Sequence, residues 1–354
     1  MNPPRPITRS LTLAVKVSVI SAIAFLLWSQ FHALDIHEAL SLLRRMGPLA
    51  VIPFLPYAFV TMLDARGWRH TMPVPRDIPM REISAIRLAT DAVMNTFPAG
   101  VAFAETLRPF LLQKRLRMRW SDALAVTIVA KINIAITQML FLLAGLALAA
   151  ISYSGPLKQT GVFATPAAGI GAAAAAALFT GALFLPYSGG RLTQLASILE
   201  HIPLDAVKQF IRRGRIVLTE IDGYLNAFRL KRKSRLLHSL GYFMLSWCVM
   251  AMETWLILTL LGANVTIVQA VIIESIAALV KLLFFFIPSG LGAQEISFAA
   301  LLSALIGPEA LALSAAFIVI RRGKELAWAG IGLGLFGYLG INPFHIPLQK
   351  SRPA

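Results

Sequence analysis

The sequence predicts an all-α polytopic membrane protein, a helical bundle built from two halves of inverted topology. Three observations lead to this fold class. The 354 residues are 57% hydrophobic and only 14% charged, which is more apolar surface than a soluble domain can bury. The apolar residues form long runs that are separated by charged stretches. Two of these runs carry the same Pro, Gly and Glu pattern, 190 residues apart (98 + 190 = 288).

The charge balance narrows the class of partner. The net charge is +16, which on a soluble chain would suggest nucleic acid. Here the Lys and Arg residues lie between apolar runs, so the expected partners are membrane lipids with anionic head groups, and nucleic acid is not expected. A second copy of the chain or a lipid-synthesis protein is a further candidate partner.

Metal, cofactor and nucleophile motifs are missing from the sequence. The histidines are scattered without metal-ligand spacing, and neither a nucleotide-binding loop nor a nucleophile elbow is present. The single cysteine, Cys248, lies in an apolar run and is expected to be a small core residue without an intrachain disulfide. We therefore expect no catalytic residues, no cofactor and no metal site.

The first half of the chain contains four expected spans and one interrupted segment. The N-terminal run is too long for a signal core and is followed by no cleavage site, so it is read as a retained span. An arginine-rich stretch, 64–90, precedes the interrupted segment at 91–112. The four spans are expected at 11–28, 47–63, 121–150 and 166–187.

The stretch 188–235 differs in composition, with ten Lys and Arg residues against four acidic residues. Within it, apolar residues recur every seven positions from Leu204 to Phe228, which predicts an amphipathic helix. Two interpretations remain open: a surface helix on an anionic leaflet, or a connector packed against the bundle.

The second half begins with an expected span at 237–261. A second interrupted segment, 266–306, follows and carries Glu274 and Lys281. The last apolar segment, 310–340, has the length of one tilted helix or of a broken pair, and Gly330 and Gly334 in it suggest close helix packing. The chain then divides into a first membrane half (1–187), a basic connector (188–235) and a second membrane half (236–354).

The distribution of cations orients these segments. With the N-terminus inside, the stretches 64–90, 113–119, 188–235 and the C-terminal tail are cytoplasmic. The far flank of the first interrupted segment, 113–119, has four cations, whereas that of the second, 303–309, has none. The two segments are thus expected to enter from opposite faces, as in an inverted repeat suited to alternating access.

The repeated motif reads Pro98-Ala-Gly100-Val-Ala-Phe-Ala-Glu105 in the first half and Pro288-Ser-Gly290-Leu-Gly292-Ala-Gln-Glu295 in the second. Pro and Gly interrupt a helix where a bilayer normally requires an unbroken one. Each Glu is followed 26 residues later by a cation, Lys131 (105 + 26) or Arg321 (295 + 26).

Ionised groups in these runs require partners or water, because each costs roughly 2.5–3.5 kcal/mol at the bilayer centre. One interpretation is a set of ion pairs that hold the repeats together. The other is a polar cavity in which arginine and lysine bind a phosphate and the glutamates hold those cations when it is empty. The candidate substrate-binding residues are Pro98, Gly100, Glu105, Arg108, Lys131, Pro288, Gly290, Gly292, Glu295, Arg321 and Arg322.

Pro98-x-Gly100-x4-Glu105-x2-Arg108 and the second motif resemble the two motifs of the lysylphosphatidylglycerol synthase transmembrane family. These flippase-like membrane domains also occur among hopanoid-associated proteins. The resemblance runs from the first span to about Gly340 and implies a bundle with two re-entrant segments that translocates lipid across the bacterial inner membrane. The soluble aminoacyltransferase domain of the full synthases is expected to be absent, and Lys131 stands where relatives often carry Arg. The lipid substrate is left open.

Three functions compete on this evidence. A phospholipid or isoprenoid-lipid translocase is favoured, with both termini cytoplasmic. The alternative is a non-catalytic accessory subunit of a membrane lipid-synthesis complex, for example for hopanoids. An intramembrane enzyme is disfavoured, because no nucleophile–base pair or metal motif is present.

Overall fold

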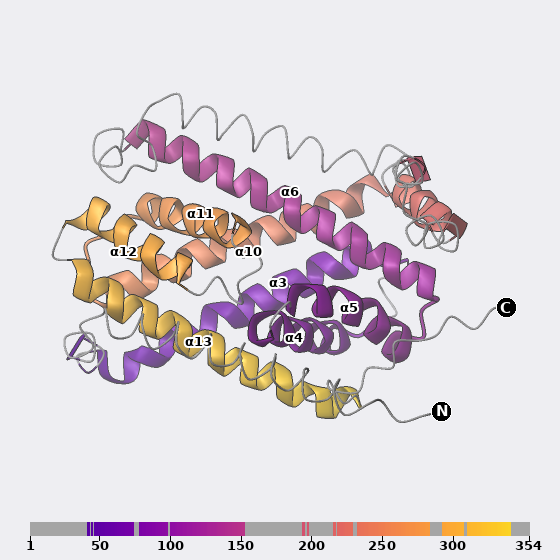
Figure 1. Ribbon diagram of the computed structural model, residues 1–354, viewed down its shortest axis with the longest axis horizontal. Coiled ribbons are helices and arrows are strands. Elements are labelled where there is room, and N and C mark those ends of the chain that lie inside the picture. The colour runs from indigo at the N-terminus through magenta and orange to yellow at the C-terminus, as the bar shows by residue number, and fades with distance from the viewer. Residues whose placement is uncertain are drawn as a thin grey trace, which may run out of the picture.

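The structure, a computed structural model, describes residues 41–42, 44, 46–73, 78–97, 100–152, 193–194, 197, 215–216, 218–228, 232–283, 292–307 and 310–340. All the regular elements in these residues are helices, which confirms the predicted all-α class (Figure 1). They are η1 (Gly47–Phe54), α3 (Leu55–Thr71), α4 (Met80–Thr96), α5 (Gly100–Leu116), α6 (Trp120–Ser152), α10 (Lys233–Leu260), α11 (Ile267–Leu283), α12 (Ala293–Ile306) and α13 (Ala310–Leu339). The expected spans 11–28 and 166–187 lie outside the described residues.

Three helical segments among the described residues are long and apolar enough to cross a membrane: Gly47–Thr71, Trp120–Ser152 and Lys233–Leu260. They coincide with the spans expected around 47–63, 121–150 and 237–261. The last segment, which was left open as one helix or two, is the single helix α13 of 30 residues.

Four helices are shorter than a membrane span. α4, α5 and α11 have 17 residues each and α12 has 14, whereas crossing takes roughly 20. The chain is interrupted between α4 and α5 and between α11 and α12, where the two motifs lie. The expectation that 64–90 separates membrane segments was wrong, because α3 continues to Thr71 and α4 begins at Met80.

The helices fall into two groups of four that correspond along the chain. α3–α6 and α10–α13 each run in the order long, short, short, long, and α13 starts 190 residues after α6 (120 + 190 = 310). The packing corresponds as well: α4 lies against α13 and α11 against α6, while α3 lies against its counterpart α10. Each group is therefore completed by helices of the other.

The corresponding long helices run in opposite directions. One apolar cluster joins Ala149, near the end of α6, to Ala310 at the start of α13. A second cluster joins Ala123, near the start of α6, to Leu339 at the end of α13. Figure 1 shows the result: α11 and α12 lie toward one end of the bundle, and α4 and α5 toward the other.

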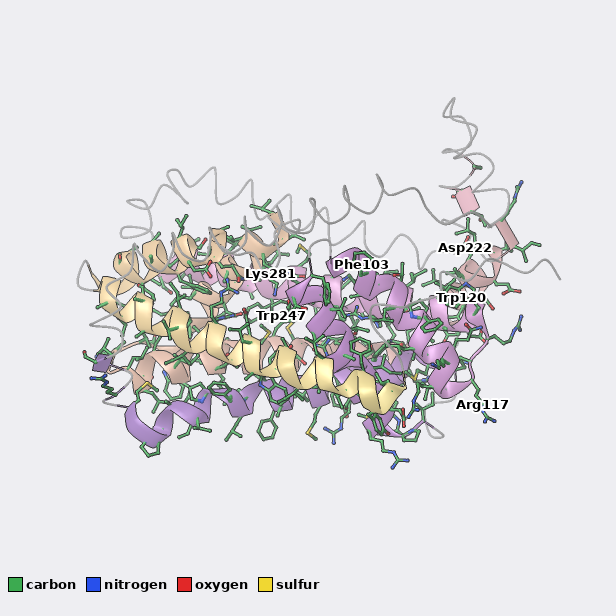
Figure 2. The ribbon with its side chains drawn as sticks, turned by 60° about the horizontal axis from the view of Figure 1, so that its bottom comes forward. Phe103, Arg117, Trp120, Asp222, Trp247 and Lys281 are labelled. Carbon is green, nitrogen blue, oxygen red and sulfur yellow. The ribbon has the colours of Figure 1, made fainter. Side chains whose placement is uncertain are left out.

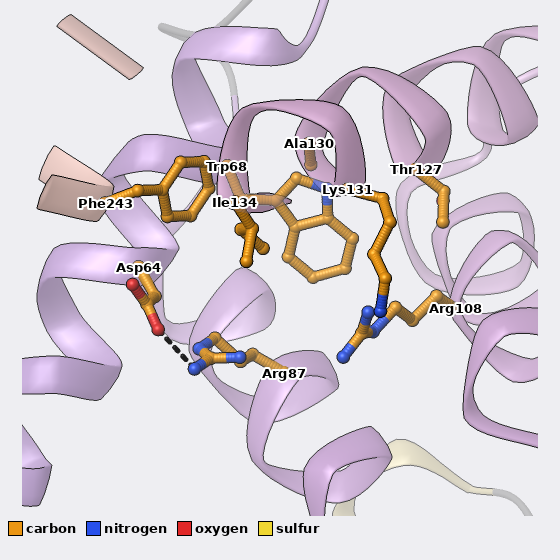
Figure 3. Close-up of a pocket in the computed structure, with 9 residues that line it drawn as sticks. All are labelled: Asp64, Trp68, Arg87, Arg108, Thr127, Ala130, Lys131, Ile134 and Phe243. Carbon is orange, nitrogen blue, oxygen red and sulfur yellow. Dashed lines mark hydrogen bonds and ion pairs between the residues drawn. The ribbon is translucent and has the colours of Figure 1, made fainter. Parts of the chain in front are cut away.

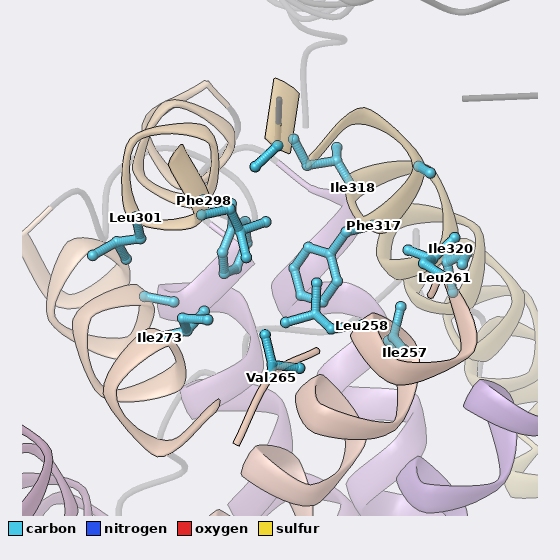
Figure 4. Packing of buried hydrophobic residues seen from close by; sticks show 14 of the residues in the cluster. Ile257, Leu258, Leu261, Val265, Ile273, Phe298, Leu301, Phe317, Ile318 and Ile320 are labelled. Carbon is cyan, nitrogen blue, oxygen red and sulfur yellow. The ribbon is translucent and has the colours of Figure 1, made fainter. Parts of the chain in front are cut away.

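The cluster at the α11–α12 end is built around two phenylalanines. The rings of Phe298 on α12 and Phe317 on α13 meet edge to face, with their centroids 5.1 Å apart. Ile273 and Leu258 pack against them from α11 and α10 (Figure 4). The two rings, at most 3% exposed, bring the short helix α12 onto the long helices.

Glycine sets the two helix crossings that join the groups. A Cβ on Gly145 of α6 would lie 2.0 Å from the Ser275 Oγ of α11, and one on Gly332 of α13 would lie 2.4 Å from the Leu88 carbonyl oxygen of α4. The expected packing pair was wrong in position, since nothing lies within 4 Å of a Cβ on Gly330 or Gly334. The small residue that packs is Gly332, between them.

The described end of the connector packs on the bundle. Ile221, Leu225 and Phe228 are buried with residues of α6 in one apolar cluster, and Arg119 pairs with Glu220 at 3.6 Å. In Figure 2, Asp222 of this segment lies toward the same end of the molecule as Trp120. For 218–228 the packed connector is thus the correct interpretation, whereas the first part of the expected helix lies outside the described residues.

Candidate functional site

Six charged side chains from four helices form a continuous chain of ion pairs, which we call the α3–α6 cluster. Its members alternate in sign in the order Asp64, Arg87, Asp91, Arg108, Glu105 and Lys131. Three acids balance three cations. The cluster therefore carries no net formal charge, which reduces the cost of placing it inside an apolar bundle.

The pairs in this cluster are close. Arg87 pairs with Asp64 and, at 2.8 Å, with Asp91 one turn along α4. Arg108 donates to Asp91 at 3.1 Å, to Glu105 at 3.0 Å and to the Thr90 hydroxyl at 3.2 Å. At the end of the chain, Lys131 donates to Glu105 at 2.7 Å.

Exposure rises along the chain of pairs. The Asp91 and Arg108 side chains are 7% and 10% exposed, whereas those of Glu105 and Lys131 are 27% and 47% exposed. Lys131 lies eleven residues after the start of α6, roughly 16 Å along the helix axis. The cluster therefore has a buried end at α3 and α4 and an open end at α5 and α6.

A small cavity lies within this cluster (Figure 3). Its volume is about 20 Å³, enough for roughly one water molecule. Lys131, Arg108 and Arg87 point toward it, and the buried Trp68 Nε1 and Arg87 Nε atoms have no hydrogen-bond partner among the described residues. A water in this cavity would have donors on several sides.

The second group of helices carries its own set of ion pairs, the α10–α13 cluster. Its members are Glu253, Glu274, Glu295, Arg321, Arg322, Lys324 and Glu325. Each of the three cations in the α13 segment 321–324 faces a different helix: Arg321 pairs with α11, Arg322 with α12 and Lys324 with α10. α13 is thereby bound to every other helix of its group.

Arg321 is fully occupied by structural contacts. It donates to both Glu274 oxygens at 2.7 Å and to the Thr254 hydroxyl at 3.0 Å. Its guanidinium also lies 5.0 Å from the ring centroid of Phe298 and 5.7 Å from that of Phe317. With 7% exposure, Arg321 has no donor available for a ligand without breaking these contacts.

Glu295 has two tasks. Its Oε2 accepts from the Gly292 amide at 2.7 Å, which closes a capping box at the start of α12, and its Oε1 accepts from Arg322 Nε at 2.6 Å. Gly292 has a φ of +87°, a conformation that favours glycine. The expected anion site at this helix start is thus already filled by the chain's own carboxylate.

Gly100 has a different reason in the first motif. A Cβ there would lie 2.4 Å from the Val93 carbonyl oxygen and 2.6 Å from that of Met94, so only glycine lets α5 start so close to the end of α4. The motif therefore sets a tight turn in one half and a capped helix start in the other. Pro98, Pro288 and Gly290 lie outside the described residues.

Two side chains lie between the clusters. Tyr57 on α3 interacts electrostatically with Asp91 of one cluster and Glu325 of the other, and the Lys324 Nζ lies 5.3 Å from its ring centroid. Lys281 at the end of α11 also interacts electrostatically with Asp91 and Glu325. The two clusters thus lie within electrostatic reach of each other, near the middle of the molecule, where Figure 2 labels Lys281.

Lys281 differs from the other cations of the site. Its side chain is exposed, and among the described residues it makes neither a hydrogen bond nor an ion pair within 4.0 Å. Arg322, by contrast, is held by Glu295 and Glu325. Lys281 is therefore the cation of this site with the most freedom to meet a ligand.

The structure brings together some predicted site residues and separates others. Glu105, Arg108 and Lys131 form one network, and Glu295 contacts Arg322. The alignment of Lys131 with Arg321 is off by one residue, because the contact partner of Glu295 is Arg322.

Several members of the site were not predicted from the sequence. Asp64, Arg87 and Asp91 fell at or near the supposed loop 64–90, although the four-residue spacing of Arg87 and Asp91 is a signal of a helical ion pair. Glu253 and Lys324 had no local signal, because their pairing depends on how α10 meets α13. No metal-binding group of three His, Cys, Asp or Glu residues occurs among the residues searched.

Comparison with known proteins gives one match. The family model described as the lysylphosphatidylglycerol synthase TM region matches residues 12–323. Neither the curated proteins nor the solved structures contain a match.

Proposed function

The chain belongs to the lysylphosphatidylglycerol synthase transmembrane family, and from this premise we propose that it moves a lipid with an anionic head group across the bacterial inner membrane. It is a membrane protein with apolar helices long enough to span a bilayer. The proposal assigns the polar interior of the bundle to the head group and the surrounding membrane to the chains.

The proposed architecture is an inverted repeat. It is supported by the opposite directions of α6 and α13 and by the two short-helix pairs at opposite ends of the bundle. α4–α5 and α11–α12 would then be re-entrant hairpins, each entering from one face and ending near the middle. With the basic flank 113–119 inside, both termini are cytoplasmic.

The head group would be bound by the exposed cations. Lys131 and Lys281 are the candidates, since Arg108 and Arg321 are buried and saturated by carboxylates. This assignment revises the expected set of phosphate-binding residues. Glu105 would hold Lys131 when no lipid is bound and release it to an arriving phosphate.

The observation that carries the proposal is the open end of the α3–α6 cluster. A hydrogen-bonded Glu105–Lys131 pair lies deep along a spanning helix, yet both side chains keep substantial exposure. Charges facing hydrocarbon at that depth would cost several kcal/mol. A water-filled path from one face to this pair removes that cost and supplies a route for a polar head group.

The alternative is a non-catalytic accessory subunit of a lipid-synthesis complex. The saturated pairs Arg321–Glu274 and Lys324–Glu253 favour it, because they hold helices together and leave no group for chemistry. Under either function we propose that the chain is not an enzyme and requires no cofactor.

Vesicles reconstituted with the purified protein and trace fluorescent phosphatidylglycerol test the proposal. An external reductant that bleaches only outer-leaflet probe should remove about half of the signal from empty vesicles and nearly all of it from vesicles with protein. The accessory function predicts bleaching equal to that of empty vesicles.

A further inference from the structure

An apolar groove lies on the face where α3 meets α10. Its volume is about 480 Å³, within the range of small-molecule sites. Its walls are formed mainly by Leu55, Phe59 and Met62 on one side and Leu245, Val249 and Met252 on the other. Phe59 and Met252 are 61% and 58% exposed, so the groove opens on the outer surface of the bundle.

The two walls are equivalent by the internal repeat. Adding 190 to Leu55, Phe59 and Met62 gives 245, 249 and 252, which are the residues of the opposite wall. α3 and α10 run in opposite directions, with Gly67 near the end of α3 packed on the Phe243 ring near the start of α10. The groove therefore lies across the contact about which the two groups are related.

One pair breaks this equivalence and gives the groove a polar end. Position 63 is leucine, whereas position 253 is glutamate. Glu253 lines the groove, is 2% exposed and pairs with Lys324 through one oxygen, while its Oε2 has no hydrogen-bond partner among the described residues. This carboxylate is shared between the groove and the α10–α13 cluster.

The opposite end of the groove carries a cation. Arg66 lines the groove, is exposed and makes no ion pair among the described residues. Leu55 and Arg66 are eleven residues apart on α3, a rise of about 16 Å. That length is close to half of a hydrocarbon core of roughly 30 Å, the depth of one leaflet.

We propose that this groove is a binding site for one hydrocarbon chain of a phospholipid, whose phosphate is held by Arg66. The apolar walls bury the chain, and the two methionines adapt to its shape. The guanidinium matches a phosphate at the membrane surface. The bound chain lies against Glu253, so lipid waits at the wall of the polar interior. The site does not depend on translocation and would be occupied in an accessory subunit as well.

Native mass spectrometry of the purified full-length protein tests the site, after delipidation and titration with phosphatidylglycerol. We expect about one tightly held lipid on the wild type. Met62→Trp and Met252→Trp fill the groove from either wall and should each reduce retention at least tenfold. Leu326→Trp, at a residue of α13 that is 70% exposed and outside the groove, should retain lipid normally. No held lipid on the wild type, or equal retention by all variants, would overturn the site.

Arg66→Gln tests the phosphate contact. The wild type should prefer phosphatidylglycerol to diacylglycerol with the same chains, and this variant should lose most of that preference while still holding a chain. An unchanged preference would remove Arg66 from the proposal.

If the tryptophan variants fail to fold, phosphatidylglycerol with a photoactivatable group in one chain replaces them on the wild-type protein. Labelling concentrated in residues 55–66 and 245–256 supports the groove. Labelling spread evenly over the exposed apolar residues of α13 contradicts it.

Discussion

Glu274 and Arg321 form a bidentate ion pair, with both guanidinium nitrogens 2.7 Å from a carboxylate oxygen. The two side chains are only 2% and 9% exposed, and the pair connects α11 to α13. A pair this deeply buried cannot be replaced by water when one partner is removed. It therefore gives a reference for the purely structural role of charge in this protein.

Glu274→Gln should be strongly destabilising. Arg321 would keep its positive charge and its burial but lose its only carboxylate partner, at a cost of about 3–5 kcal/mol. We expect a markedly lower midpoint in thermal unfolding of the detergent-solubilised protein. Glu220→Gln, in an exposed 3.6 Å pair, is the matched control and should unfold as the wild type does. A midpoint for Glu274→Gln equal to that of the control would show that water reaches Arg321.

The two motif glutamates should differ in their effect on stability. Glu105 is partly exposed, so Glu105→Gln is expected to cost less than about 1 kcal/mol. Glu295 is 7% exposed, and Glu295→Gln would weaken a charged hydrogen bond to Arg322, at about 1.5–3 kcal/mol. Arg322 keeps Glu325, so the loss stays below that of Glu274→Gln. The reverse order of unfolding midpoints would contradict the assigned exposures.

Glu82 predicts an acid-sensitive contribution to stability. It accepts hydrogen bonds from Arg115 at 3.0 and 3.1 Å and from the Tyr338 hydroxyl at 2.7 Å, joining α4, α5 and α13. Burial acts to raise the pKa of Glu82, but these two donors outweigh it and hold the pKa below its ordinary value of 4.5.

Because the folded pKa is the lower one, the unfolded state binds more protons as the pH falls. The contribution of Glu82 is therefore complete above about pH 4.5 and is lost as the pH drops through the folded pKa. Glu82→Gln should flatten the acid limb of a stability-against-pH curve, and Tyr338→Phe should flatten it less. An acid limb in Glu82→Gln as steep as that of the wild type would assign the effect to other carboxylates.

Cysteine labelling tests the inverted arrangement. Gln113 lies on α5 beside one apolar cluster, and Ser303 lies on α12 beside the cluster at the other end. In a Cys248→Ser background, Gln113→Cys and Ser303→Cys should react with a membrane-impermeant reagent from opposite faces. The Cys248 replacement is needed because this thiol is exposed, contrary to the core position expected from its apolar surroundings. Reaction of both from one face would end the inverted-repeat proposal.

The positions of the helices could be predicted from the sequence because they depend on local pattern. The breaks near Gly100 and Gly292 follow from Pro and Gly, and the spans around α6 and α10 follow from their apolar length. The connector residues Ile221, Leu225 and Phe228 were likewise on the predicted apolar seam and are buried.

The pairing of charges could not be predicted in the same way. Arg322 rather than Arg321 meets Glu295, since one residue along a helix turns a side chain by about 100° and the facing helix decides which side chain is met. The burial of Asp64 and Arg87 depends on α3 meeting α4. Arginine-rich composition suggested a loop there, but tertiary ion pairs keep these residues in helices.

The rate at which phosphatidylglycerol crosses vesicles containing Glu105→Gln tests the central claim most directly. Removing this carboxylate deprives Lys131 of its partner while leaving the fold intact. We predict that the variant loses at least nine-tenths of the wild-type rate at an unchanged unfolding midpoint, while vesicles with Glu220→Gln keep the full rate. A wild-type rate in Glu105→Gln would contradict the proposal that this ion pair lines the path of the head group.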